Sequence, residues 1–157
     1  MLDEGLCQSF MGMALQEAQI AAQRGEVPVG ALVVDKDGAV LASASNRVEE
    51  LHDPTAHAEM LALRQAAAKC GDARLVDCDI YVTLEPCAMC AAAISFARIR
   101  RLYFAAYDVN GGAVDHGPKF FSQPTCHHAP EVYGGMMEQE GRAVLQQFFK
   151  TLRTDKS

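Results

Sequence analysis

The chain has 157 residues, half of them apolar, which is enough for one compact globular domain with a sizeable buried core. Fourteen Lys and Arg oppose twenty Asp and Glu, which gives a formal net charge of -6. This is the wrong sign for a protein that binds phosphates over its whole surface, so a polybasic nucleic-acid reader is excluded. A single local basic patch is compatible with this charge.

The start of the chain and its cysteines indicate a cellular compartment. The first ten residues are acidic and lack the basic start and apolar stretch of an export signal. No uncharged stretch reaches the ~20 residues that cross a bilayer. We therefore expect a cytoplasmic protein without a membrane partner. Six cysteines in a reducing compartment are thiols or metal ligands rather than a disulfide framework.

Hydrophobic periodicity predicts a helix, a hairpin and a second helix in the first half of the chain. Apolar residues at spacings of three and four predict an amphipathic helix over residues 6–21. Two β-favouring runs separated by an Asp-Gly turn predict a hairpin of residues 29–34 and 39–43. A stretch rich in Ala, Leu and Met then predicts a helix over residues 56–69.

The second half continues the alternation of strands and helices. The predicted elements are, in chain order, a strand at 79–84, a helix at 87–96, a strand at 101–105, a short strand at 131–133 and a helix at 136–153. Pro86 fits the first position of the middle helix. Residues 108–130 lack periodicity and predict an irregular loop. Interleaved helices and strands predict a layered α/β domain, and the initial hairpin makes its sheet of about five strands mixed.

Two short motifs, each at the head of a predicted helix, carry the residues that point to chemistry: His57-x-Glu59 and Pro86-Cys87-x-x-Cys90. Cysteines three apart on a helix share a face, and the helix amino end favours their thiolate forms. With His57 they make a three-ligand set, which leaves the fourth tetrahedral position of a zinc ion open to water, as in catalytic sites. Glu59 is then the natural proton shuttle.

Each motif alone also has an ordinary interpretation. A Cys-x-x-Cys pair can be a redox pair or two small core residues, and a His-x-Glu pair commonly lies on a helix surface. Residues two apart in a regular helix diverge by roughly 200°, so His57 and Glu59 converge only in a first turn that is not yet regular. Together, each after an extended segment, the two motifs match the signature of zinc nucleobase deaminases.

The sequence resembles the cytidine deaminase superfamily, and within it the bacterial tRNA-specific adenosine deaminases, which convert wobble adenosine to inosine. The resemblance covers most of residues 6–153. The stretches that carry it are EVPVGA at 26–31, NR at 46–47, HDPTAHAE at 52–59, YVTLEPCAMC at 81–90 and FFK at 148–150.

This resemblance implies a three-layer α/β/α fold, with residues 1–157 forming a single zinc-dependent deaminase domain. It implies one Zn²⁺ per subunit, held by His57, Cys87 and Cys90. It also implies a homodimer and the tRNA anticodon loop as partner. The reaction implied is hydrolytic release of ammonia from the wobble adenosine.

The resemblance also implies roles for three further residues. Glu59 would accept a proton from the attacking water, protonate N1 of the ring and later hand a proton to the leaving ammonia. Asn46 would hydrogen-bond the base or its ribose. Asp108 matches the start of a loop on the substrate side.

The charge distribution bears on this RNA hypothesis. Residues 1–85 carry six basic and fourteen acidic side chains, a net charge of -8, whereas residues 86–157 carry eight and six, a net charge of +2. Lys150, Arg153 and Lys156 on the last helix, with Lys119, fit a cationic rim for phosphates; a solvated helix end that complements the dipole explains the helix residues equally well. We expect the acidic half to face away from RNA.

Two alternatives stay open at this point. A free nucleobase or nucleoside deaminase of the guanine or cytosine type is favoured by the acidic charge and by a loop at 108–130 that departs from the wording of the tRNA branch. A non-catalytic zinc-stabilised RNA-binding subunit is disfavoured, because Glu59 stands beside an open ligand set. The adjacent residues Cys126, His127 and His128 fit a structural loop better than a second metal site.

Overall fold

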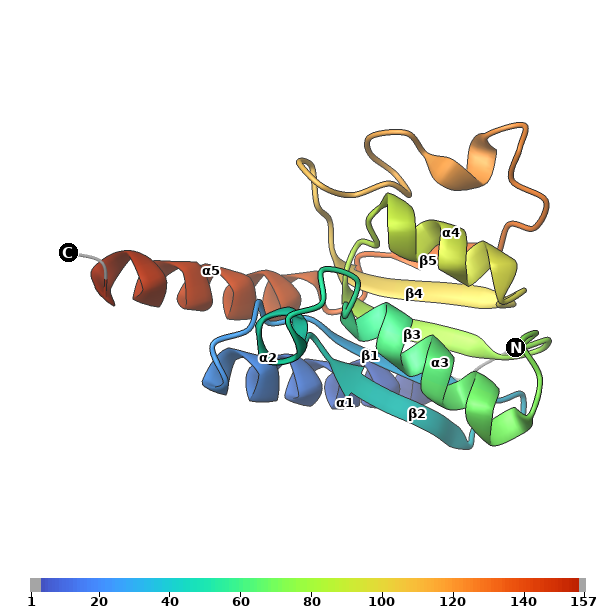
Figure 1. Cartoon of the computed structure of the whole chain (residues 1–157), viewed down its shortest axis with the longest axis horizontal. Helices are drawn as coiled ribbons and strands as arrows, with labels where there is room; N and C mark the ends of the chain where they lie inside the picture. The colour runs from blue at the N-terminus through green and yellow to red at the C-terminus, as the bar shows by residue number, and fades with distance from the viewer. Residues whose placement is uncertain (1–3, 156–157) are drawn as a thin grey trace.

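The computed structural model describes residues 4–155 and shows a five-stranded sheet between two layers of helices (Figure 1). The elements are, in chain order, α1 Glu4–Gln23, β1 Gly30–Val34, β2 Val40–Ser45, α2 Val48–Leu51, α3 Ala58–Cys70, β3 Asp79–Leu84, α4 Ala88–Phe96, β4 Arg101–Ala106, the 3-10 helix η1 Phe120–Ser122, β5 Glu131–Gly134 and α5 Glu138–Asp155. The predicted α/β class with its mixed sheet is confirmed, and every predicted element is present to within two residues at either end.

The topology of the sheet brings four strand ends together. The strand order is β2-β1-β3-β4-β5. Strand β1 is antiparallel to both of its neighbours, whereas β3, β4 and β5 are parallel to one another. Strands β2, β3, β4 and β5 therefore all run in one direction, and the loops that follow them emerge at the same edge. In sheets with parallel strands this edge is the usual place for a ligand site.

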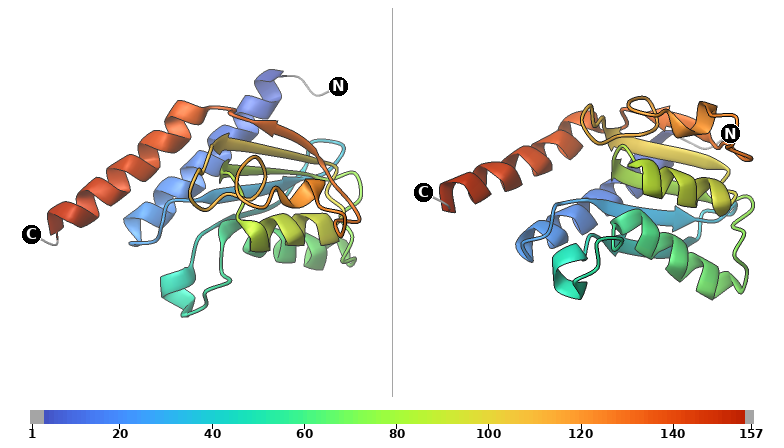
Figure 2. Two further views of the ribbon diagram at one scale, coloured as in Figure 1. Left: turned by 90° about the horizontal axis from the view of Figure 1, so that it is seen from above. Right: turned by 45° about the horizontal axis from the view of Figure 1, so that its top comes forward.

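Helices cover both faces of the sheet (Figure 2). Helices α1 and α5 lie on one face, and α3 and α4 lie on the other. Alternate residues of β3 serve the two layers: Tyr81 packs in the cluster under α1, and Ile80 and Val82 pack in the cluster under α3 and α4. Since β3 is buried on both faces, it is a rigid support for the loop that leaves its carboxyl end.

Three sequence expectations differ from the structure. Helix α2 and the 3-10 helix η1 were not predicted, because both are too short to show a periodicity. Pro86 does not occupy the first position of α4: the N-cap is Cys87, in an extended conformation, so Pro86 lies outside the helix. The extended cap redirects the Cys87 side chain, as described below.

A buried ion pair fastens the edge of the sheet where β3 and β4 begin. The Asp79 carboxylate, 2% exposed, accepts hydrogen bonds of 3.0 Å from Nε and Nη2 of Arg100. Arg101 lies 3.9 Å from the same carboxylate. Because charged hydrogen bonds to a buried group are strong, this cluster stabilises the parallel pair of strands β3 and β4.

Over residues 4–155, no helix combines the length and apolar character needed to span a membrane.

Helix α1 approaches β1 so closely that only glycine fits at Gly30. A β-carbon built there would overlap the carbonyl oxygen of Ala14 and lie 2.8 Å from the amide nitrogen of Ala18. Backbone atoms of a helix cannot give way as the end of a flexible side chain can. The contact between α1 and the sheet therefore depends on this residue.

The variant Gly30→Ala is expected to lower the free energy of unfolding by about 2–3 kcal/mol, because α1 must shift away from β1. Urea denaturation followed by circular dichroism measures this. The matched control is Gly12→Ala, in a helix with open space around the new methyl group, where stability is expected to rise by up to ~1 kcal/mol. Equal stabilities for the two variants would contradict the close packing of α1 on β1.

Candidate active site

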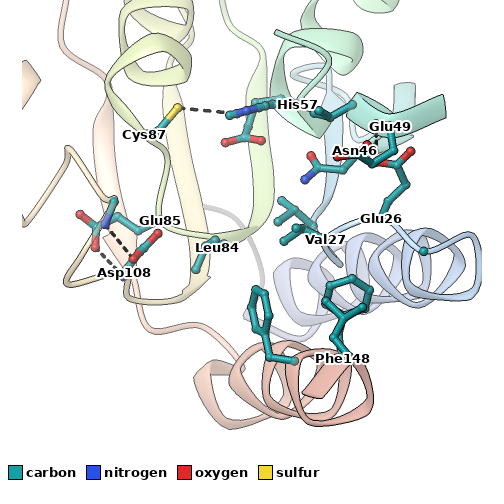
Figure 3. Close-up of a pocket in the computed structure, with 17 residues that line it drawn as sticks. Glu26, Val27, Asn46, Glu49, His57, Leu84, Glu85, Cys87, Asp108 and Phe148 are labelled. Carbon is teal, nitrogen blue, oxygen red and sulfur yellow. Dashed lines mark hydrogen bonds between the residues drawn. The ribbon is translucent and has the colours of Figure 1, made fainter. Parts of the chain in front are cut away.

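The predicted metal ligands converge where α3 and α4 begin. His57 and Cys87 are the N-cap residues of these helices, and both have extended backbone conformations. Cys90 follows in the first turn of α4. The sulfur atoms of Cys87 and Cys90 lie 3.6 Å and 3.5 Å from Nδ1 of His57 (Figure 3 shows Cys87 and His57). The three ligand atoms all lie within 4.8 Å of one another.

These separations fit a zinc ion. With Zn–S near 2.3 Å and Zn–N near 2.0 Å, tetrahedral coordination separates a sulfur from a nitrogen ligand by about 3.5 Å. Two thiols and one imidazole are also ligands that zinc prefers, and three protein ligands leave one position for water. Within residues 4–155, no second group of three His, Cys, Asp or Glu residues comes together in this way.

The two cysteines have opposite protonation preferences in the protein alone. Hydrogen bonds donated by Cys90 and by His57 lower the pKa of Cys87 to about 4, although burial opposes this. The same contact with Cys87, together with burial, raises the pKa of Cys90. The hydrogen bond to Cys87 raises the pKa of His57. These shifts favour a thiolate at Cys87, which is the form in which a cysteine binds zinc.

Glu59 lies beside the ligand set and is 4% exposed. Because His57 is an extended N-cap and Glu59 is the second residue of α3, the divergence expected between helical residues two apart does not apply. Burial is the largest cause of a raised pKa of about 7 at Glu59, and the charge of Cys87 acts in the same direction. A carboxyl group that titrates near neutral pH can both accept and return a proton.

The ligand set opens into a cavity of about 540 Å³ at the edge of the sheet where the strands end. Asn46 contributes to its wall after β2, Leu84 at the end of β3, and Asp108 after β4. Figure 3 shows Phe148 of α5 on the side of the cavity away from His57. The volume is in the range of small-molecule sites, so the cavity admits a single base but not a folded RNA.

The two predicted substrate-binding residues both line this cavity. Oδ1 of Asn46 accepts a hydrogen bond of 2.8 Å from the amide of Ala58, at the start of α3. This contact fixes the amide plane so that its nitrogen faces the cavity as a donor (Figure 3). Oδ1 of Asp108 accepts from the amides of Asn110 and Gly111, so this side chain is held within its own turn.

The acidic half of the chain does not wholly face away from the site. Besides the proton shuttle Glu59, three acidic residues of this half line the cavity, so that expectation is wrong for them: Glu26, Glu49 and Glu85. The Glu26 carboxylate, itself 2% exposed, accepts hydrogen bonds from the amides of Glu49 and Glu50 and so holds the start of α2. No Lys or Arg is among the described lining residues. The cavity therefore suits a neutral polar ring rather than a phosphate.

Sequence reasoning missed the contribution of α5 to the cavity. Phe148, Phe149 and Leu152 line it, although the sequence placed the two phenylalanines only on the apolar side of a helix. The signal present in the sequence is this apolar group directly beside Lys150 and Arg153, which are exposed on the same helix. The third predicted basic residue of this helix, Lys156, lies outside the described residues.

The Cys-His-His run is part of an anchored loop. The hydroxyl of Ser95 in α4 donates to the carbonyl oxygen of His128 at 2.6 Å. Nε2 of His128 donates to the carbonyl oxygen of Ile99 at 2.7 Å. Cys126 contacts the carbonyl oxygen of His128. These contacts attach the loop to the end of α4 distant from the cysteine ligands, as the structural interpretation predicts.

Comparison with known proteins agrees with this geometry. Residues 6–106 match the family model described as the cytidine and deoxycytidylate deaminase zinc-binding region. The chain belongs to this family of zinc-dependent deaminases.

Its relatives indicate a branch within the family. The chain is 58% identical over 146 residues to a tRNA-specific adenosine deaminase of Agrobacterium fabrum, which covers 93% of this chain and 95% of the relative. It is 43% identical to the protein of the same description in Aquifex aeolicus, with the same coverage. A solved structure from a study of A-to-I editing by tRNA:A34 deaminases is 58% identical, with a TM-score of 0.86 over 87% of this chain and 99% of that chain.

Replacing one ligand tests the metal site. Cys87→Ala is expected to weaken zinc binding by more than about 100-fold, because loss of a ligand costs more than loss of the groups that orient it. Zinc per chain, measured by mass spectrometry of metals after dialysis, checks this. Cys70→Ala, at an exposed cysteine, is the matched control and retains zinc. A fully loaded Cys87→Ala protein would show that another set of residues holds the metal.

Proposed function

We propose that the protein is a zinc-dependent hydrolase that converts adenosine to inosine at the wobble position of tRNA and releases ammonia. The observation that carries the proposal is the position of Glu59. It lies beside an open Cys₂His ligand set, on the wall of a cavity that fits one base. The relative named tRNA-specific adenosine deaminase, 58% identical over 93% of this chain, supports the choice of substrate.

The chemistry divides between the metal and the side chains around it. His57, Cys87 and Cys90 would hold zinc, which supplies a water molecule acidified enough to act as nucleophile at neutral pH. Glu59 accepts a proton from that water and delivers one to N1 of adenine. The oxygen of water bonds to C6 as N1 is protonated, and Glu59 then takes the proton of the new C6 hydroxyl and transfers it to the departing nitrogen. The C6–N bond then breaks, and ammonia and inosine are formed.

The cavity also explains how a large substrate reaches a small site. A base within a folded tRNA loop must leave the stack before it can enter the cavity, and such loops are the usual place of specific RNA recognition. Helix α5 extends past the edge of the sheet (Figure 1). Its apolar side chains line the cavity, and the exposed Lys150 and Arg153 lie next to them on the same helix. We infer that these cations contact the phosphates next to an extruded base.

Three further properties belong to the same proposal. Residues 1–157 form one deaminase domain, because the ligands, the proton shuttle and the cavity wall are drawn from elements along most of the chain. A tRNA substrate is consistent with a cytoplasmic enzyme. The family resemblance supports a homodimer.

The role of Glu59 is tested by Glu59→Gln. The variant is expected to keep one zinc per chain and to lose about 10²- to 10⁴-fold in kcat, because the amide cannot shuttle a proton. Inosine formed in a tRNA with adenosine at position 34 is quantified by reverse transcription and sequencing. Glu140→Gln, at an exposed carboxylate of α5, is the matched control and keeps full activity. Undiminished turnover in Glu59→Gln would instead assign proton transfer to another group.

The role of α5 is tested by its basic residues. The double variant Lys150→Ala/Arg153→Ala is expected to raise KM for tRNA and to reduce the slope of log KM against log salt by about 2, one for each phosphate contact. Lys69→Ala/Arg74→Ala is the control: it removes two exposed charges near the carboxyl end of α3, the end distant from His57, and is expected to leave both quantities unchanged. Identical salt dependence in the two double variants would show that these residues of α5 do not contact phosphate.

The acidic lining of the cavity keeps one alternative as an outcome of the substrate test, namely a deaminase of a free nucleobase or nucleoside. Ammonia release from guanine, cytosine and their nucleosides is measured beside the tRNA reaction. We expect release only with tRNA. Rapid turnover of a free base with no inosine in tRNA would overturn the proposed substrate while leaving the zinc chemistry in place.

A further inference from the structure

A buried carboxylate organises one wall of the cavity. Glu85 follows β3, and its side chain is fully buried. Oε1 accepts hydrogen bonds from the amide of Asp108, at 3.0 Å, and from Nδ1 of His116, at 2.8 Å. Oε2 accepts from the amides of Val114, Asp115 and His116, at 3.0–3.1 Å. Glu85 thus receives five hydrogen bonds, all from a single loop of nine residues.

This loop, residues 108–116, contains no helix or strand. Its other backbone hydrogen bonds run from the amide of Gly112 to the carbonyl oxygen of Asp108 and from the amide of Ala113 to that of Pro86, while the carbonyl oxygens of Ala113 and His116 accept from the amides of Phe120 and Lys119. Buried amides need acceptors, and here the carboxylate supplies what a strand or helix supplies elsewhere. The conformation of the loop therefore depends on one side chain that is not part of it.

The loop fits closely around this carboxylate. A β-carbon built at Gly112 would lie 2.5 Å from Cδ and Oε2 of Glu85 and 2.5 Å from the carbonyl oxygen of Asp108. Glycine is therefore required at this position for the backbone to pass the carboxylate. The close packing of the loop therefore requires both the carboxylate of Glu85 and the absence of a side chain at Gly112, although these residues are far apart in sequence.

We propose that Glu85 is a positioning residue for the deamination reaction. Its carboxylate holds residues 108–116 by hydrogen bonds and so fixes the position of Asp108 and Gly111, which line the cavity. The reference point is the ligand Cys87, which follows Glu85 by two residues. The inference rests on the proposed function for its kinetic consequence. A glutamine cannot take this role, because its NH₂ group would face amide donors where Glu85 offers only acceptors.

The same strand carries a matched control. Asp79 begins β3 and is as deeply buried as Glu85, but it pairs with Arg100 and Arg101 at the opposite edge of the sheet and is not among the lining residues. Replacing either carboxylate by its amide removes a buried acceptor from β3 or its end. Only Glu85→Gln changes the wall of the cavity.

The test compares Glu85→Gln with Asp79→Asn in the zinc-loaded protein. For Glu85→Gln we expect one zinc per chain, a kcat/KM for tRNA lower by about 10- to 100-fold, mostly through KM, and amide exchange at 108 and 114–116 faster by about tenfold or more. Asp79→Asn is expected to lower the thermal midpoint while kcat/KM and exchange in this loop stay unchanged. Unchanged kcat/KM in Glu85→Gln, or an equal loss in Asp79→Asn, would overturn the inference.

A second variant serves if Glu85→Gln does not fold. Gly112→Ala keeps the carboxylate but displaces the loop from it, so it should reproduce the rise in KM and the faster exchange. Gly12→Ala, with open space around the new methyl group, controls for the substitution itself. If Gly112→Ala behaves like Gly12→Ala in both measurements, the loop does not depend on its fit around Glu85.

The exchange measurement separates this inference from the proposed function. It uses no substrate, so it reports on the loop even if the wild-type protein leaves adenosine in tRNA unchanged. In that case the proposed substrate fails, and KM is compared on the free base or nucleoside that releases ammonia. If the loop amides in Glu85→Gln exchange as slowly as in the wild-type protein, the positioning role is contradicted, whichever substrate is turned over.

Discussion

The site depends on two helices that begin side by side at one edge of the sheet. Strands β2 and β3 run in the same direction with the antiparallel β1 between them, so the chain leaves both at that edge. Each is followed by a helix on the same face, α3 or α4 (Figure 2). The N-caps His57 and Cys87 are extended, which directs their side chains across the helix starts toward each other. The amide groups exposed at a helix start also favour a thiolate there.

Local signals made part of this arrangement predictable. The bounds of β3 follow from an uninterrupted β-favouring run, which is typical of a strand buried on both faces. The spacing of Cys87 and Cys90 and the position of His57 before a helical stretch were sufficient to predict the ligand set. The requirement that His57 and Glu59 meet in an irregular first turn is satisfied because His57 is an N-cap.

Contacts between distant residues made the remainder unpredictable. The short helix α2 is held by Glu26, whose carboxylate accepts hydrogen bonds from the amides of Glu49 and Glu50, more than twenty residues further along the chain. The fit between Glu85 and Gly112 likewise leaves no periodic pattern in the sequence. Periodicity marks the apolar side of α5 but does not show that Phe148 reaches the cavity beyond the sheet edge. In each case the partner is chosen by the tertiary structure and not by neighbours along the chain.

The distribution of charge acquires a different meaning once the cavity is known. The described lining residues are acidic or neutral, and the exposed cations Lys150 and Arg153 lie outside it on α5. This lining disfavours a phosphate in the cavity, whereas an uncharged purine can enter. The negative net charge of the chain thus does not oppose binding of RNA through one extruded base.

The buried carboxylates show how the protein separates these electrostatic requirements. Asp79, distant from the metal site, is neutralised by the arginines Arg100 and Arg101. Glu26 and Glu85, which line the cavity, are held mainly by backbone amides, which stabilise a carboxylate without adding a formal charge. Zinc with two thiolates and an imidazole is already neutral overall, so an arginine beside it would draw phosphate into the site. Amide donors shape the cavity wall without attracting phosphate.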